Sequence, residues 1–281
     1  MTKPLLVYFI SESTAITAQT LGNSLLSQFE DVEFERHYMP YINTIEKAQE
    51  LADELRDVTA WNGDKPIVFA TMPDKEIDAM LRSASCHYYE LFSGYLKQLS
   101  DAIGITPSYR FGLSHGIANA RSYDKRMDIV NYSLTHDDGM ILNDLDEADI
   151  ILVGVSRSGK TPTSLYLALQ FGVKTANYPL TEEDFERGRF PDVLLGNADK
   201  LVGITIDPLR LQEIREKRRP GSKYASLQTC QQEVRQAERF FSRYGTPVLD
   251  STTRSIEELA SQIVRVHHVQ HPVKPPRANH E

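Results

Sequence analysis

Short apolar runs alternate with amphipathic segments along the first third of the chain. The apolar runs predict strands and the helically spaced segments predict helices. The strands are expected over residues 5–11, 33–41 and 66–72, and the helices over 14–29, 44–58, 73–84 and 86–102. Strands that alternate with helices of this length are typical of a parallel sheet covered by helices.

A second alternating region follows a stretch in which this periodicity fades. Around residues 104–116, glycine, proline and serine become frequent, which predicts a linker. Beyond it, strands are expected over residues 149–155, 200–207 and 246–252, and helices over 123–137, 162–172, 208–219, 224–245 and 255–269. We therefore expect an α/β protein with two domains, residues 1–108 and 109–270. Residues 271–281 are polar and proline-rich and are predicted to be a disordered tail.

Composition excludes several classes of protein. The chain has 281 residues, of which 41% are hydrophobic and 25% charged, as in ordinary soluble proteins. Its net charge of −8 argues against nucleic acid or membranes as partners. Cys86 and Cys230 are too far apart for a zinc motif, and reduced thiols are typical of a cytoplasmic protein. The apolar run at residues 5–10 is too short for a signal peptide or a membrane span.

One short segment has the spacing of a phosphate-binding loop. "GVSRSGKT", residues 154–161, matches the Walker A pattern and lies between a predicted strand and a predicted helix. Successive amides and a helix N-terminus bind phosphate in such loops. The candidate nucleotide-binding residues are Gly154, Val155, Ser156, Arg157, Ser158, Gly159, Lys160 and Thr161. Lys160 would neutralise phosphate charge and Thr161 would bind magnesium; the alternative is a strand-to-helix turn that binds nothing.

Two acidic positions are candidates for the remaining chemistry. Asp207 ends a predicted strand, where a second metal ligand is usual, but an aspartate before Pro208 is also a common turn. In "THDDG", two aspartates follow His136 at a predicted helix C-terminus, where the helix dipole disfavours negative charge. Asp137 and Asp138 could therefore take up a proton or bind a metal, or Asp138 could open a turn with Gly139.

These motifs together resemble one bacterial family. "GVSRSGKTPTSLYLALQFGVKTANYPL", with "THDDG" before it and "LVGITIDPLRLQEIREKRR" after it, is similar to the phosphoenolpyruvate synthase regulatory proteins. A sister group acts on pyruvate, phosphate dikinase. The similarity covers the chain up to its proline-rich tail, and the Gly159–Pro162 form favours the synthase branch. In relatives an aspartate typically follows the first strand, whereas this chain has Glu12.

The resemblance implies a bifunctional enzyme. One activity is an ADP-dependent serine/threonine protein kinase that phosphorylates a threonine of the synthase and inactivates it. The other removes that phosphoryl group with inorganic phosphate, releases pyrophosphate and reactivates the synthase. The implied cofactors are ADP and Mg²⁺, with inorganic phosphate as co-substrate. The alternatives are the same chemistry on the dikinase, a small-molecule P-loop kinase, and a nucleotide sensor without catalysis.

The resemblance and the motifs together assign roles to the two domains. Residues 109–270 are expected to form the P-loop-containing kinase domain. Residues 1–108 are expected to form a Rossmann-like domain, which by elimination serves partner recognition or formation of a homodimer. The basic helix at 208–219 could hold phosphate or an acidic partner, or could simply be solvated.

Within the kinase domain, each candidate side chain has an expected role. Lys160 is expected to hold the donor, and Thr161 with Asp207 to hold magnesium. Asp137, with His136 next, is expected to accept the proton of the target threonine. Arg157 would stabilise the transferred group, or is a solvated loop cation.

Pro162 has no amide hydrogen, whereas the α-phosphate of a bound triphosphate usually accepts a hydrogen bond from the amide at this position. The proline would suit ADP if the β-phosphate occupies the place in the loop that a γ-phosphate normally occupies. Alternatively, Pro162 is only a favourable residue for the first turn of a helix.

Overall fold

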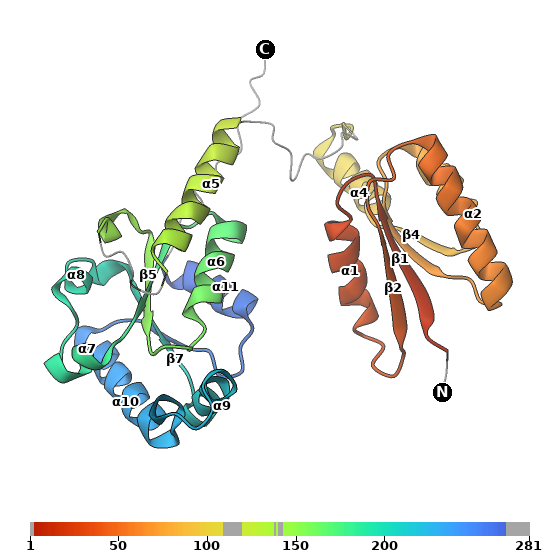
Figure 1. Cartoon of the computed structure of the whole chain (residues 1–281). Helices are drawn as coiled ribbons and strands as arrows, with labels where there is room; N and C mark the ends of the chain where they lie inside the picture. Colours follow the sequence, from red (N-terminus) through yellow and green to blue (C-terminus); the bar gives the residue numbers. More distant parts are fainter. Residues whose placement is uncertain (1–2, 109–119, 138, 140–142, 268–281) are drawn as a thin grey trace, which may run out of the picture. The chain divides into compact units, whose positions relative to one another are not determined.

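The computed structural model describes residues 3–108, 120–137, 139 and 143–267 of a chain that divides into two compact units. The first unit is Met1–Gly116 and the second is Ile117–Glu281. Each contains one four-stranded parallel sheet with helices packed on both faces (Figure 1). The α/β class expected from the alternating pattern is confirmed.

The first unit alternates strands and helices from its start. Its elements are β1 (Leu5–Ser11), α1 (Ile16–Leu26), β2 (Phe34–Met39), α2 (Ile45–Asn62), β3 (Ile67–Thr71), α3 (Lys75–Arg82), β4 (His87–Glu90) and α4 (Ser93–Ile103), with strand order β2-β1-β3-β4. Successive β1 side chains point to opposite faces. Val7 and Phe9 pack with α1, and Tyr8 and Ile10 pack with α2 and α3. Both faces are therefore buried, which explains why β1 reads as one apolar run.

Strand β4 corrects the helix predicted over residues 86–102. His87–Glu90 pairs in parallel with β3, and the helix begins only at Ser93. Exposed and half-buried positions alternate along β4, and Tyr88 packs against the core beneath α2 and α3. Two adjacent tyrosines favour a strand, and pairing with the edge of β3 outweighs the helical spacing of the segment.

The second unit carries the predicted phosphate-binding segment. Its sheet consists of β5 (Ile150–Gly154), β6 (Thr175–Pro179), β7 (Leu201–Thr205) and β8 (Val248–Asp250) in the order β6-β5-β7-β8. Its helices are α5 (Ala120–Thr135), α6 (Lys160–Tyr166), α7 (Glu182–Arg187), α8 (Asp192–Leu195), α9 (Pro208–Arg218), α10 (Leu227–Tyr244) and α11 (Ile256–His267). A π-helical turn, Leu167–Phe171, extends α6 to Gly172.

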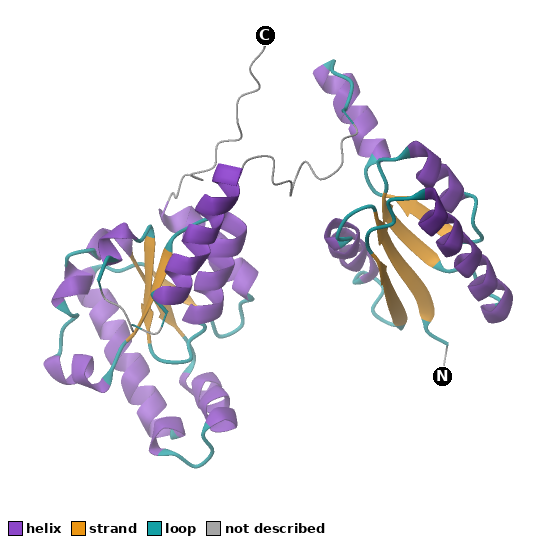
Figure 2. Cartoon of the chain, turned by 45° about the horizontal axis from the view of Figure 1, so that its top comes forward, coloured by secondary structure: helices purple, strands orange, loops and turns teal. Residues whose placement is uncertain are grey.

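Strand β5 is an inner strand of this sheet and is buried on both faces. Figure 2 shows helices on both sides of the sheet. Ile151 and Val153 face a core formed with α9 and α10, whereas Ile150 and Leu152 face a core formed with α11. Because all four strands are parallel, the segments that follow their carboxyl ends meet at one edge of the sheet. That edge holds the loop between β5 and α6.

Among the described helices, none is both long enough and apolar enough to cross a bilayer.

Candidate phosphate site at the β5–α6 loop

The loop of residues 155–159 leaves β5 in a conformation that its glycines permit. A Cβ atom on Gly154 would lie 2.3 Å from the carbonyl oxygen of Ile204, so only glycine allows β5 and β7 to approach this closely. Gly159, with φ of 91°, caps α6 in the left-handed region. Arg157 also has a positive φ of 75°, which is strained for a residue with a side chain.

The loop presents hydrogen-bond donors that the protein itself does not use. Within the described ranges, the backbone amides of Ser156, Arg157 and Gly159 have no hydrogen-bond acceptor. The Ser158 hydroxyl also has no partner among the described residues, although its side chain is only 1% exposed. Unused donors at a helix N-terminus fit the oxygens of a phosphate group. The donors of this loop could therefore bind the oxygens of a phosphate group.

Lys160 folds back over this loop. Its side chain is buried, with 4% exposure, and Nζ donates to the carbonyl oxygen of Val155 at 2.8 Å. The same carbonyl accepts the Ser158 amide at 3.3 Å. A positive charge is thus fixed beside the amide donors.

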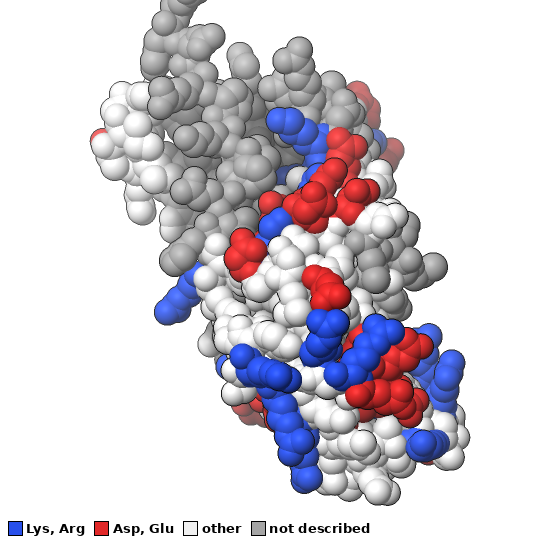
Figure 3. Space-filling view, turned by 90° about the vertical axis from the view of Figure 1, so that its left-hand side faces the viewer, with Lys and Arg blue, Asp and Glu red and all other residues white. Residues whose placement is uncertain are grey.

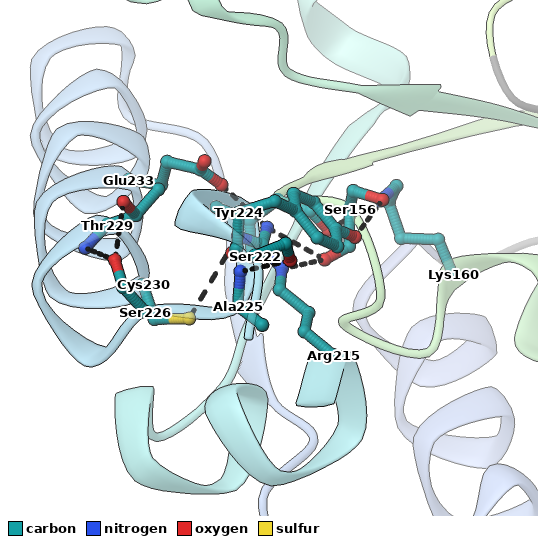
Figure 4. Close-up of polar contacts among 11 residues, drawn as sticks. Ser156, Lys160, Arg215, Ser222, Tyr224, Ala225, Ser226, Thr229, Cys230 and Glu233 are labelled. Atoms are coloured by element: carbon teal, nitrogen blue, oxygen red, sulfur yellow. Dashed lines mark hydrogen bonds and ion pairs between the residues drawn. The ribbon is translucent and has the colours of Figure 1, made fainter. Parts of the chain in front are cut away.

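A buried arginine fixes the opposite side of the loop (Figure 4). Arg215 of α9 has no exposed surface, and its Nη2 donates to the carbonyl oxygen of Ser156 at 3.1 Å. Nη2 also pairs with Glu233 of α10 at 2.6 Å, and the guanidinium lies 4.0 Å from the ring of Tyr224. The Tyr224 hydroxyl is 3.0 Å from Ser156 Oγ. Arg215 therefore shapes the loop and does not project into solvent with the rest of the basic helix.

Thr161 connects the loop to the "THDDG" segment. Its hydroxyl donates to Asp137 Oδ1 at 2.9 Å, and Asn177 Nδ2 donates to the same oxygen at 2.5 Å. Asn177 Nδ2 also lies 3.0 Å from Thr161 Oγ1. The structure thus places Asp137 next to the loop, as the side chain that accepts a bond from the Thr161 hydroxyl.

His136 is held by the backbone. Its ring nitrogens lie 2.9 Å from the carbonyl oxygen of Tyr132 and 3.0 Å from that of Asn143, and the ring stacks on Tyr132. These contacts favour a role in anchoring the segment after α5. A proton-accepting role for His136 stays a prediction, and Asp138 lies outside the described residues.

Asp207 begins α9. Its Oδ1 accepts the amides of Leu209 and Arg210, and its own amide donates to Thr252 Oγ1. This is the helix-capping use of an aspartate before proline. Binding of a metal by Asp207 stays a prediction.

Several residues at this edge were not predicted from the sequence. Asn177 is 2% exposed in β6, and a polar residue inside a buried strand was the signal that could have identified it. Tyr224 and Glu233 carry no such signal, because only the fold brings them to Arg215. Arg157, by contrast, was predicted and projects from the loop as an exposed side chain.

The surface agrees with the net negative charge of the chain. Figure 3 shows one face, on which basic and acidic side chains are interspersed over its described part. Some basic side chains are paired with acidic neighbours on their own helix or loop, as Arg187 is with Glu183 and Arg189 with Asp192. An anion must therefore be bound by local donors such as those of the loop.

Comparisons with known proteins agree on one family. A profile described as Kinase/pyrophosphorylase matches residues 7–264. Three relatives carry the name "Putative phosphoenolpyruvate synthase regulatory protein". The protein of Thiocapsa roseopersicina is 50% identical, over 92% of this chain and 96% of its own. The Bordetella avium protein is 46% identical over 92% and 94%, and that of Legionella pneumophila 44% over 92% and 96%. The chain belongs to the kinase/pyrophosphorylase family.

Proposed function

We propose that the protein regulates phosphoenolpyruvate synthase by two opposed phosphoryl transfers. It phosphorylates a threonine of the synthase with ADP as donor, and it removes that phosphoryl group with inorganic phosphate, forming pyrophosphate. The names of the relatives and the family description support this target and this class of reaction. The observation that carries the proposal is the set of unused donors at the β5–α6 loop, next to Lys160 and Thr161.

In the kinase direction, the loop amides and Lys160 would hold the β-phosphate of ADP, which is the group transferred. Phosphoryl transfer depends mainly on positioning and on charge neutralisation, which these groups supply. Thr161 would hold Mg²⁺, whose charge offsets that of the phosphates, and Asp207 and Asp137 are the candidate carboxylates for the same ion. Asp137 is also the candidate for taking the proton of the target threonine, because its carboxylate already accepts from Thr161.

Pro162 fits this choice of donor. It stands in the first turn of α6, where the helix itself needs no amide hydrogen. With the β-phosphate of ADP in the terminal position of the loop, the place normally occupied by an α-phosphate is not used. A Pro162→Ala variant should then gain affinity for ATP and not for ADP, as measured by equilibrium binding. An equal gain in affinity for both nucleotides would contradict this placement of the β-phosphate in the loop.

The direct test uses Lys160→Ala. The wild-type protein, incubated with synthase and ADP labelled on its β-phosphorus, should transfer the label to a synthase threonine, and mass spectrometry should locate the phosphothreonine. Lys160→Ala should lose both transfer and phosphate-dependent removal by at least about 100-fold, because charge neutralisation is removed. Lys200→Ala, in the same unit, is the matched control and should retain both activities.

A folded Lys160→Ala variant with normal rates in both directions would refute the proposed site. Because Lys160 is buried, its replacement could disturb folding. The circular dichroism spectrum and the unfolding midpoint of the Lys160→Ala protein must therefore first match those of the wild type. Thr161→Val provides a second variant of the same site if Lys160→Ala does not fold. Label found in a small product instead of the synthase would indicate a small-molecule kinase.

A further inference from the structure

A cavity of about 510 Å³ lies beside the β5–α6 loop in the second unit. It is bounded by three segments that follow parallel strands: the loop after β5, the start of α9 after β7, and residues 251–256 after β8. The lining side chains that can bind an anion are Arg157, Ser158, Arg210, Ser251, Thr252 and Arg254. Of this lining, the roles assigned above use the loop residues 157–159, but not Arg210, residues 251–252 or Arg254.

The cavity has the chemistry of an anion site. Arg157 has no ion-pair or hydrogen-bond partner among the described residues, while Arg254 donates only to the carbonyl oxygen of Asp250 at 3.3 Å. Arg210 pairs with Glu213, which lies on the same helix and is exposed. Arginine side chains bind phosphate oxygens through two parallel bonds. The buried and unpartnered Ser158 hydroxyl belongs to the same lining.

We propose that this cavity binds the phosphate group that is not transferred, as AMP in one direction and as inorganic phosphate in the other. This inference rests on the proposed function. In the kinase direction the threonine oxygen attacks the β-phosphorus of ADP, the bond from that phosphorus to the bridging oxygen breaks, and AMP leaves with the electron pair. The threonine proton passes to the carboxylate of Asp137.

In the opposite direction an oxygen of inorganic phosphate attacks the phosphorus of phosphothreonine. The bond to the threonine oxygen breaks, that oxygen takes up the proton that the attacking phosphate loses, and pyrophosphate is released as the product. The bond between the transferred phosphoryl group and its neighbouring phosphate therefore breaks in one reaction and forms in the other. A single anion site beside the loop satisfies both reactions.

The dimensions and lining of the cavity favour this dual occupancy. Ligand sites for small organic molecules measure about 300–1,000 Å³, so the cavity has room for a nucleoside in addition to a phosphate group. Ile206, Ile214 and Ile256 supply apolar surface for the base, and the arginines supply the charge for the phosphate. Arg157 and Ser158 belong both to the loop and to the cavity, which joins the two phosphate positions.

Binding to the full-length protein without synthase tests the proposal. Isothermal titration calorimetry should detect AMP and inorganic phosphate binding to the wild type, and phosphate should compete with AMP. Arg254→Gln should weaken both ligands by about 10-fold, because one charged contact to phosphate is lost. Arg210→Gln should act in the same direction, and Arg187→Gln, an exposed arginine of α7, is the matched control.

Kinetics provide the second readout. Arg254→Gln should raise the KM for ADP in phosphorylation and the KM for phosphate in dephosphorylation, with comparable factors. A change for one substrate alone, or simultaneous binding of AMP and phosphate, would overturn the shared site. If Lys160→Ala abolishes both activities while the Arg210 and Arg254 variants bind both ligands normally, the cavity proposal fails and the proposed function stands.

Discussion

At the scale of single residues, Arg215 shows how a surface pattern can conceal a buried role. It belongs to a basic helix that from the sequence could be a solvated or anion-binding face, yet the side chain is buried. Burial of a guanidinium is tolerated only when its donors are satisfied, here by the carbonyl oxygens of Ser156 and Tyr224 and by Glu233. Arg215 is therefore a positioning residue for the loop.

A double-mutant cycle can measure this contribution. Arg215→Met removes the partner of Glu233 and leaves two carbonyl groups without donors, so the free energy of unfolding should fall by about 3 kcal/mol. Adding Glu233→Met should recover part of this loss, because it removes the unpaired carboxylate. Urea unfolding of both variants and of Glu233→Met alone checks the prediction. Strictly additive losses would show that the pair is not coupled.

Glu12, at the end of β1, also has a structural partner. Its side chain is buried at the end of β1, and Oε1 accepts the amide of Asp74 at 2.8 Å. Burial raises the pKa of this carboxyl above its ordinary value; the bond from the Asp74 amide opposes the shift, and the nearby Asp74 carboxylate adds to it. The longer side chain of glutamate thus ties the end of β1 to the start of α3.

This raised pKa predicts a dependence of stability on pH. Above its ordinary pKa, unfolded Glu12 has lost its proton while the folded protein still holds it, so folding stability decreases as pH rises through this window. Glu12→Gln keeps the oxygen that accepts from Asp74 but does not titrate. The unfolding free energy of the variant relative to wild type should therefore increase from about pH 4 upward and then level off. Urea unfolding at a series of pH values checks this, and a difference that is independent of pH would contradict it.

At the scale of elements, the sequence predicted those whose pattern is strong. The strands expected at residues 5–11, 149–155 and 200–207 are confirmed as β1, β5 and β7, because burial on both faces gives continuous apolar runs. The helices α9 and α10 also agree with their expected ranges within a few residues. The short helices α7 and α8 were not predicted, since one or two turns carry too little periodicity.

The site was predictable only as far as it is local in sequence. The β5–α6 loop is one continuous segment, and its spacing identified it. The contacts of Asp137 with Asn177 and of Arg215 with Ser156 join residues 40 and 59 positions apart, and no short-range pattern encodes them. The cavity likewise exists only because parallel strands bring three separate segments to one edge.

The cap of α9 allows the two roles of Asp207 to be separated. Asp207→Ala removes the acceptor for two helix amides and should cost about 1 kcal/mol of stability. Asp207→Ser retains a capping oxygen but has no carboxylate, so it should restore the stability. If capping is the main role, Asp207→Ser should also retain transfer activity, as followed with labelled ADP. A stable but inactive Asp207→Ser variant would instead support a metal ligand.

At the scale of the whole molecule, each unit has its own hydrophobic cores. The core beneath α2 and α3 contains residues of the first unit only, and the cores on the two faces of β5 contain residues of the second unit only. Separate cores allow separate unfolding. A defect in one core should therefore remain within its own unit.

Matched core substitutions test this independence. Leu55 of α2 and Leu152 of β5 are both fully buried, and replacement by alanine should cost about 2–5 kcal/mol in each case. Leu55→Ala should increase hydrogen–deuterium exchange only in the first unit and leave the affinity for ADP unchanged. Leu152→Ala should increase exchange only in the second unit and weaken the binding of ADP. Increased exchange in both units after either substitution would show that they unfold together.

The close approach of Gly154 to Ile204 has a consequence for synthesis on the ribosome. The loop leaves the exit tunnel well before β7. The residues that position it, Arg215 and its partner Glu233, emerge after that strand. A nascent chain that ends before β7 can contain all of residues 154–161 while this segment has not yet reached its folded conformation. Competence to hold a nucleotide should thus arise late in translation, once α10 has cleared the ribosome and docked.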